Sequence, residues 1–472
     1  MNVRVIALLV LALGGHTIAA SAQTGGTQPT DPKESRLGAE IRLERDDLAE
    51  DCSSVKNFAS CAATLATDHP FHVSLGSIAP QNGFGAGPAV VTHFTPTNWR
   101  LTWSGDAVFA PAGAWRAGTY LKLLRSKIEP PQLGGPGERA RPLRITEYPV
   151  YNVYAQANSL PKLTFYGIGS DTSIADKTAY GMSETILGGN AAIPLSTVAP
   201  LKLSLLLEAN GRLFDIRGAT ADDVPSIKTR FTEVTAPGVT THPAFAQFGE
   251  GVRLRPWLFN DRLQFGYTFL YQQFASSDSS FSFRRWTIDL NHQVPLYHTG
   301  GGPALRDERN TPNECSVSPL VDACPSVTRD LWGSISVRVL VSKSQVGDSG
   351  VVPFYLQRTL GGSDIDGQRA LASYDDYRFR GPHLMLFQET VEHALWGPIG
   401  ALVLLEQGKV AAQGEALSFS GLQHSVGIGA TLRAGGFPAV AASWHTGGPE
   451  GRHFIFTIDT SLLGGGGRPA LQ

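Results

Sequence analysis

The sequence predicts an all-β protein, a transmembrane antiparallel β-barrel with sixteen strands as the working number. The clearest strand segment, Gln264–Gln272, places four aromatic side chains on one face and mostly small or polar residues on the other. Because successive residues of a strand point to opposite sides, this segment separates an apolar environment from a wet one. Similar segments recur between turn residues, and an export signal precedes them. A membrane barrel with a polar lumen is therefore the leading interpretation.

The chain begins with a segment typical of export. Residues 1–22 have a positive start, an apolar run over Ile6–Leu13 and small residues at Ala20–Ala22, and we expect a signal peptide. The apolar run is too short to span a bilayer, and no later stretch approaches 18 uncharged apolar residues. Residues 23–69 are polar and weakly patterned. We expect a periplasmic linker there, with a short helix near Lys33–Glu50.

Composition agrees with many strands joined by turns. The 472 residues include 52 glycines, and charged residues make up 17%, against a usual share of about 25%. The formal net charge of −2 gives no basic surface, so no nucleic-acid partner is expected.

The barrel is expected over residues 70–463, followed by a Gly-rich tail at 464–472. Sixteen strands would use about 24 residues each with a connection, which suits strands of about ten residues. Twelve or eighteen strands fit the same arithmetic. Expected strands include Trp99–Phe109, Trp115–Leu123, Tyr148–Ala157, Leu163–Ile168, Leu201–Leu207, Arg285–Asn291, Ser334–Val341, Val426–Leu432 and His453–Asp459.

A secreted soluble β-protein is the alternative fold, since its strands also alternate. Two features favour the barrel. Aromatic residues gather on the apolar faces near strand ends, as in the girdles of membrane barrels, and charged residues occupy the opposite faces within strands, as suits an aqueous lumen.

The four cysteines form two close pairs, Cys52 with Cys61 and Cys315 with Cys324. Outside the cytoplasm this arrangement favours two local disulfides. A metal site is the alternative, but no Cys-x-x-Cys motif is present.

Several segments carry a family resemblance. They are Phe165–Ser173, Arg230–Thr232, Pro237–Gly238, Val352–Tyr355, Leu360–Asp364, Tyr374–Arg380 and Glu406–Val410. In this order they resemble the BamA/TamA-type outer-membrane assembly barrels, the bacterial surface antigen family, over roughly 160–462. The resemblance implies a sixteen-stranded barrel with a long inward loop between strands eleven and twelve, whose Arg-Gly-aromatic tip packs against the inner wall.

The tip departs from the family pattern. The matching positions are Leu371–Tyr374, so the aromatic residue is kept while the Arg and Gly are replaced. Arg369 lies just upstream, and either it reaches a wall carboxylate or it is a solvated loop residue. The residues expected to matter in the lumen loop at 361–382 are Asp364, Asp366, Arg369, Tyr374, Arg378 and Arg380.

Wall carboxylates are expected at Glu389, Glu392 and Glu406. Glu389 and Glu392 are three residues apart in one strand, so they face opposite sides. We expect the outward one near a membrane interface, because a carboxylate in the lipid midplane is costly.

No enzymatic chemistry is expected, and no cofactor or metal. Gly347–Gly350 is similar to the nucleophile loop of trypsin-like proteases, but no local His motif accompanies it, and a tight turn is favoured. Asp364–Gly367 could hold calcium, yet its spacing does not match an EF-hand loop, and a polar loop tip is favoured.

The resemblance implies protein insertion or translocation in the bacterial cell outer membrane, surrounded by outer-membrane lipid. Family members usually carry periplasmic POTRA domains ahead of the barrel, and residues 23–69 are too short for one of ordinary size. A separate POTRA-bearing or chaperone partner in the periplasm would then supply the docking platform. The alternatives are a passive solute pore or structural barrel, and a secreted soluble β-rich protein.

Overall fold

The structure is a computed structural model that describes most of residues 71–458. The described ranges are 71–94, 99–125, 149–195, 202–219, 224–255, 257–258, 263–299, 331–396, 399–434, 437–448 and 450–458. The expected signal peptide, the linker, all four cysteines and the tail at 464–472 lie outside these ranges.

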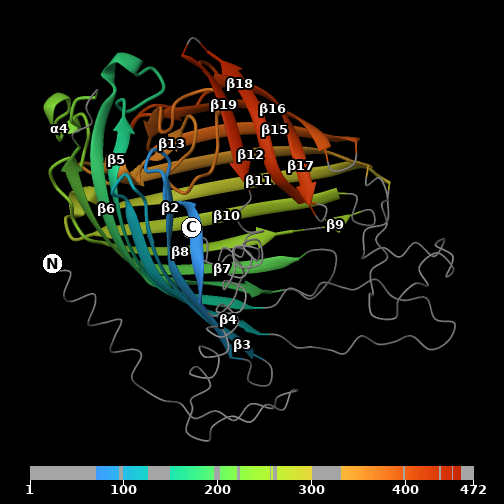
Figure 1. The fold of residues 1–472 in the computed structure, drawn as a ribbon. Helices are drawn as coiled ribbons and strands as arrows, with labels where there is room; N and C mark the ends of the chain where they lie inside the picture. Colours follow the sequence, from blue (N-terminus) through green and yellow to red (C-terminus); the bar gives the residue numbers. More distant parts are fainter. Residues whose placement is uncertain are drawn as a thin grey trace, which may run out of the picture.

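Sixteen long strands form the wall (Figure 1). They are β1 (Phe71–Ser77), β2 (Phe84–Phe94), β3 (Trp99–Phe109), β4 (Trp115–Arg125), β5 (Val150–Phe165), β6 (Thr178–Pro194), β7 (Leu203–Gly218), β8 (Phe245–Leu254), β10 (Leu263–Ser276), β11 (Phe283–Thr299), β12 (Leu331–Val346), β15 (His383–Trp396), β16 (Ile399–Ala411), β17 (Gln423–Ala434), β18 (Phe437–Gly447) and β19 (Gly451–Ile458). The two-residue strand β9 (Trp257–Leu258) pairs with β10 next to β8. The all-β class and the number of wall strands expected from the sequence are confirmed.

Each wall strand pairs antiparallel with the next one along the chain, from β1 to β19. Figure 1 shows the sheet curled into a barrel, with β2 and β19 both on the near side. Among the described residues no ladder joins β1 to β19. We call the region between the β1–β2 hairpin and β19 the seam. No helix in the described ranges is long and apolar enough to cross a membrane.

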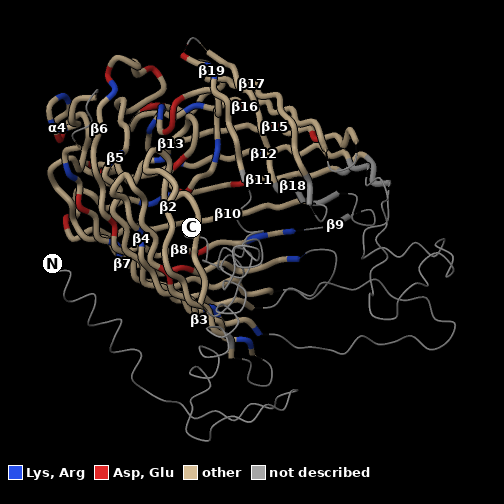
Figure 2. Tube along the Cα trace, in the orientation of Figure 1, with Lys and Arg blue, Asp and Glu red and all other residues tan. Residues whose placement is uncertain are grey.

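The sheet has an apolar outer face and a largely polar inner face. On β10, Phe269 points outward opposite Val252 and Ile288, and its side chain is 42% exposed. Gln272 points inward and is 2% exposed. Its buried amide donates a hydrogen bond of 2.6 Å to Glu208 Oε1 on β7. The Lys, Arg, Asp and Glu positions along the strands can be followed in Figure 2. The alternation predicted from the sequence thus sets the two faces of the wall.

The chain between β12 and β15, residues 347–382, turns back into the barrel and is here called the inner loop. It contains the 3₁₀ turn η4 (Phe354–Leu356) and a hairpin of β13 (Arg358–Leu360) and β14 (Phe379–Gly381). It leaves the wall after the eleventh strand and returns at the twelfth, as the family resemblance implies. A tight turn at Gly347–Gly350 begins it, with a hydrogen bond of 2.9 Å between the end residues.

The main hydrophobic core lies where the inner loop packs against the inner wall. Phe354 is fully buried, with its ring centroid 5.1 Å from that of Phe165 and 5.0 Å from that of Tyr180. Burial of each such side chain stabilises the fold by about 1.5–3 kcal/mol. A second cluster explains why Leu384–Phe387 is apolar on both faces: Leu384 and Leu386 face inward against Leu360 and Leu371 of the inner loop.

One strand prediction was wrong. The expected separate strands Tyr148–Ala157 and Leu163–Ile168 form the single strand β5, which ends at Phe165. The pairing with β6 shifts between Leu160 and Leu163, so the chain passes through an irregularity without leaving the sheet. Periodicity alone places a break there because the shift moves the apolar positions out of phase.

A buried ion pair on the inner wall gives a stability prediction. Arg212 donates hydrogen bonds of 2.8 and 2.5 Å to Glu184 Oε1, and the two side chains are 18% and 9% exposed. Replacing Glu184→Ala leaves the guanidinium without its carboxylate, and we expect the free energy of unfolding to fall by about 3 kcal/mol. Glu184→Gln keeps an acceptor and should lose less. Denaturant unfolding followed by gel mobility measures both, and equal losses would contradict the assignment.

Candidate functional site at the barrel seam

The inner loop folds sharply at two glycines. Gly361 and Gly362 have φ angles of 100° and 58°, in the left-handed region that favours glycine. A Cβ on Gly361 would lie 2.6 Å from Arg378 Cβ, and one on Gly362 would lie 2.7 Å from Asp376 N. Only glycine lets the two halves of the loop approach this closely, and this approach brings the segment 374–378 to the wall.

Arg378 binds two turns of the wall, the one between β5 and β6 and the one between β18 and β19. Its side chain is 1% exposed. It donates to Glu450 in the β18–β19 turn over 2.5 and 2.7 Å, and to Thr172 Oγ1 in the β5–β6 turn over 2.8 Å. The guanidinium also lies over the rings of Tyr166 and Phe379, 4.9 and 4.6 Å from their centroids. A planar guanidinium group with several N–H donors is suited to binding partners in two turns at once.

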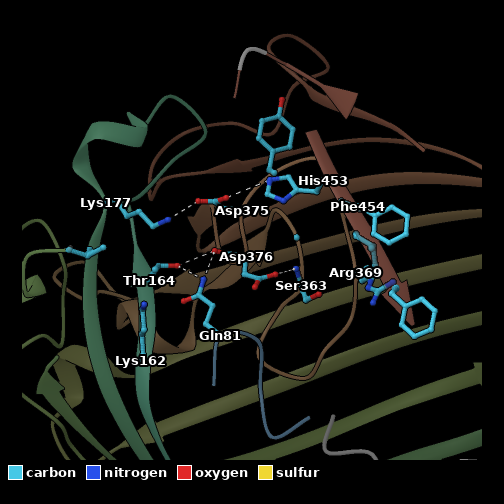
Figure 3. A pocket seen from close by; sticks show the side chains of 16 residues that line it. Gln81, Lys162, Thr164, Lys177, Ser363, Arg369, Asp375, Asp376, His453 and Phe454 are labelled. Atoms are coloured by element: carbon cyan, nitrogen blue, oxygen red, sulfur yellow. Dashed lines mark hydrogen bonds and ion pairs between the residues drawn. The ribbon is translucent and has the colours of Figure 1, made fainter. Parts of the chain in front are cut away.

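Two acidic residues of the loop line the seam from inside (Figure 3). Asp375 Oδ2 accepts hydrogen bonds of 2.8 Å from Tyr166 and from Lys177, and its Oδ1 lies 3.6 Å from His453 Nε2 on β19. The carbonyl oxygen of Asp376 accepts from Thr164 at 3.1 Å and from Gln81 at 3.5 Å. The inner loop therefore contacts the β1–β2 hairpin, β5 and β19 at the same time.

The environments of these two carboxyl groups differ. Burial acts to raise the pKa of Asp375, but the hydrogen bonds from Lys177 and Tyr166 outweigh it, so its pKa is lowered. Burial raises the pKa of Asp376, against the hydrogen bond from the Ser363 backbone. Asp375 is thus the more strongly ionised of the pair and the one that faces cations.

The loop tip meets the wall through both backbone amides and side chains. Glu406 on β16 accepts a hydrogen bond of 2.7 Å from the Ala372 N–H, and the Tyr374 hydroxyl donates to Gln423 over 3.0 Å. Arg369 donates to the Thr457 hydroxyl on β19. The Glu406 carboxylate therefore accepts a hydrogen bond from a backbone amide of the loop tip. The Arg369 side chain instead reaches the last strand, β19.

The remaining predicted residues are more widely placed. Arg380 donates to the Phe354 carbonyl over 2.8 Å and to the Tyr180 hydroxyl over 3.2 Å. Asp364 Oδ1 accepts from the backbone of Asp366 and Gln368, so it shapes the tip. Side-chain groups of three or more acidic, His or Cys residues that could hold a metal ion do not occur in the ranges that the structure describes.

The two carboxylates of β15 face opposite sides, as their spacing predicts. Glu392 is buried on the inner face and accepts a hydrogen bond of 3.1 Å from Thr431. Glu389 points outward between Val337 and Leu405, and it is the seventh of 14 strand residues. The expected position of this carboxylate near a membrane interface stays a prediction.

A pocket of about 610 Å³ lies at the seam (Figure 3). Gln81, Thr164, Asp375 and His453 give it polar walls, and β19 borders it with Phe454 and Phe456, whose side chains lie on the other face of the strand from His453. Phe454 and Phe456 are among the more exposed aromatic residues, at 63% and 57%. The pocket therefore offers one polar and one apolar surface beside the last strand.

Segments that resembled family motifs separately meet at this site. Tyr166 and Thr172 of the Phe165–Ser173 segment bind the inner loop, and the Pro237 carbonyl accepts from Phe354 N over 2.8 Å. Sequence reasoning missed Glu450 and His453, because a single acidic residue in a turn and a single His in a strand carry no recognisable spacing. Their only signal was their position around the last strand.

Structure comparison finds three solved structures with partial similarity to this chain. CdiB from Acinetobacter baumannii has 10% identity and a TM-score of 0.43 over 83% of this chain, and this chain spans 57% of that protein. BamA from Haemophilus ducreyi lacking POTRA domains 1–3 has 10% identity and a TM-score of 0.46, with 82% and 70% covered. CdiB from Escherichia coli has 11% identity and a TM-score of 0.45, with 82% and 60% covered.

No protein-family model and no curated protein sequence matches the chain.

Replacing Arg378→Ala should loosen the inner loop and the seam. The variant leaves Glu450 without its cation and removes a buried side chain, so we expect a loss of about 3 kcal/mol in the free energy of unfolding. Arg378→Lys keeps the charge but not the fork and should recover only part of it. Thermal unfolding followed by gel mobility measures the loss. Full recovery by Lys would contradict a role for the planar fork.

The loop tip gives a pH prediction. Asp366 is open to lumen water, yet enclosure by the surrounding wall, with repulsion from Asp364 and Glu184, raises its pKa to about 6. An unfolded Asp titrates near ~3.9, so the folded state binds more protons between these values and stability falls as pH rises through that window.

Asp366→Asn should therefore raise the thermal transition at pH 7.5 and change it little at pH 4.5. The exposed Asp348 provides the control, because Asp348→Asn should change neither value. An equal shift at both pH values would show that the Asp366 charge is not what destabilises the loop.

Proposed function

We propose that the chain is an outer-membrane β-barrel that inserts or translocates other polypeptides at its seam. The apolar outer face supports a position in lipid, because a sheet tolerated by the bilayer needs its backbone groups paired and its outer side chains apolar. The inner face carries ion pairs such as Arg338 with Asp289, at 2.8 Å, which suits an aqueous interior.

The seam pocket carries the functional part of the proposal. A client β-strand has alternating side chains, apolar on one side and polar on the other. The pocket offers the same division, with Phe454 and Phe456 on one side and Asp375 and His453 on the other. Edge strands bind extended peptides through main-chain hydrogen bonds, and pockets for alternate side chains add specificity.

A separate periplasmic partner belongs to this proposal. Such a partner, POTRA-bearing or a chaperone, would deliver clients to the barrel. Its loss should produce the same defect as loss of the barrel.

A passive pore is the second candidate function. The lumen contains a polar cavity of about 520 Å³, and lumen charges could then select solutes. A pore predicts conductance without an assembly defect, whereas an insertion barrel predicts that other outer-membrane proteins decrease when it is depleted.

Site-specific photocrosslinking tests the seam. A photoreactive phenylalanine analogue at Phe456 should form adducts with other outer-membrane proteins during their assembly, because this side chain lines the seam pocket. The same analogue at Phe269, an outward residue of β10 with similar exposure, is the matched control. Adducts at both positions, or at neither, would contradict the proposal.

A further inference from the structure

A second cavity in the lumen is lined mainly by arginines. It has a volume of about 520 Å³, and we call it the arginine cavity. Its charged lining consists of Arg253, Arg255, Arg338, Arg369 and Asp289. Four guanidinium groups therefore face one carboxylate in a polar space enclosed by the barrel wall.

The cavity is built on neighbouring strands. Arg253 on β8 pairs with Thr268 on β10, which pairs with Asp289 on β11. Two residues further along β11, Asn291 pairs with Arg338 on β12. The four strands place these side chains on the same inner face. Arg369 reaches the cavity from the inner loop, so the loop tip covers the wall patch.

The carboxylate of Asp289 is already occupied by one of the arginines. Arg338 Nε donates to Asp289 Oδ1 over 2.9 Å, and Nη2 donates to Oδ2 over 2.8 Å. This pair is neutral as a unit. The lining therefore holds more guanidinium groups than carboxylates. Arg369 also donates to Thr457, and Arg253 and Arg255 each have a further interaction.

We propose that the arginine cavity binds a small oxyanion of phosphate or carboxylate type. Guanidinium forks match the oxygens of such anions, and walls of low dielectric constant strengthen the field in a cleft of one charge sign. Thr268 and Asn291 add neutral donors at the same place. The proposal does not depend on the seam, because it requires only the lumen.

Equilibrium dialysis with radiolabelled inorganic phosphate tests this on the purified full-length barrel in detergent. We expect saturable binding that weakens as sodium chloride rises from 50 mM to 1 M, since screening acts on charge attraction. Sulfate should compete with phosphate more strongly than chloride does. Absence of saturable binding, or competition by chloride as strong as by sulfate, would overturn the proposal.

Three variants locate the site. Arg253→Gln and Arg255→Gln should each weaken phosphate binding by about tenfold, because each removes a charged hydrogen-bond donor. Asn291→Asp adds a carboxylate at an exposed lining position and should weaken it similarly. Arg284→Gln, at an exposed outward position of β11, should leave binding unchanged.

Heat-modifiable gel migration of each variant shows that it is folded. Arg255 is itself exposed, so its replacement tests the charge without disturbing a packed region. Binding that is unchanged in all three cavity variants would refute this location. Intact phosphate binding with no crosslinks at the seam would leave the oxyanion site standing and remove only the function proposed for the seam.

Discussion

The guanidinium of Arg378 is the contact on which the arrangement of the seam depends. It is almost fully buried, and it joins the inner loop to Thr172 in the β5–β6 turn and Glu450 in the β18–β19 turn, which are far apart in the sequence. A buried charge is tolerated only when it is paired and its donors are satisfied. The chain must therefore place both turns against the loop before this site is stable. Folding of the loop and shaping of the seam are thus coupled events.

The inner loop also changes the character of the wall beside it. An aqueous lumen favours polar inward residues, yet β15 presents Leu384 and Leu386 inward. These side chains pack on the loop, so part of the inner wall is a dry protein core and part faces the polar cavities. The same loop provides Arg369 to the arginine cavity and Asp375 to the seam pocket. Movement of the loop would alter both sites together.

The strand pattern was predictable from the sequence, and the contacts between strands were not. Alternation over Gln264–Gln272 correctly separates the outward aromatic residues from inward ones such as Gln272, because face assignment is a local property. The irregularity between Leu160 and Leu163 could not be read in this way, because a shift of register depends on the partner strand. Family motifs indicated the inner loop, but they did not indicate that Glu450 would bind Arg378.

The roles of individual charges were the least predictable. A wall carboxylate was one expected partner of Arg369, but its side chain donates to the Thr457 hydroxyl. The wall carboxylate of Glu406 accepts a hydrogen bond from the Ala372 backbone N–H. Which group reaches a carboxylate depends on loop geometry of a few ångströms, which spacing along the chain does not fix. The arginine cavity is a similar case, since its lining comes from four strands and the inner loop, spread over residues 253–369 of the sequence.

Single-cysteine labelling along β10 tests the central claim of a two-sided wall most directly. A fluorophore placed in turn at residues 265 to 272 of the barrel in vesicles would be exposed to a lipid-soluble and to a water-soluble quencher. A wall with an apolar outer face and a polar inner face predicts that the lipid-soluble quencher acts at odd-numbered positions and the water-soluble one at even-numbered positions. Equal access of the water-soluble quencher to every position would contradict it.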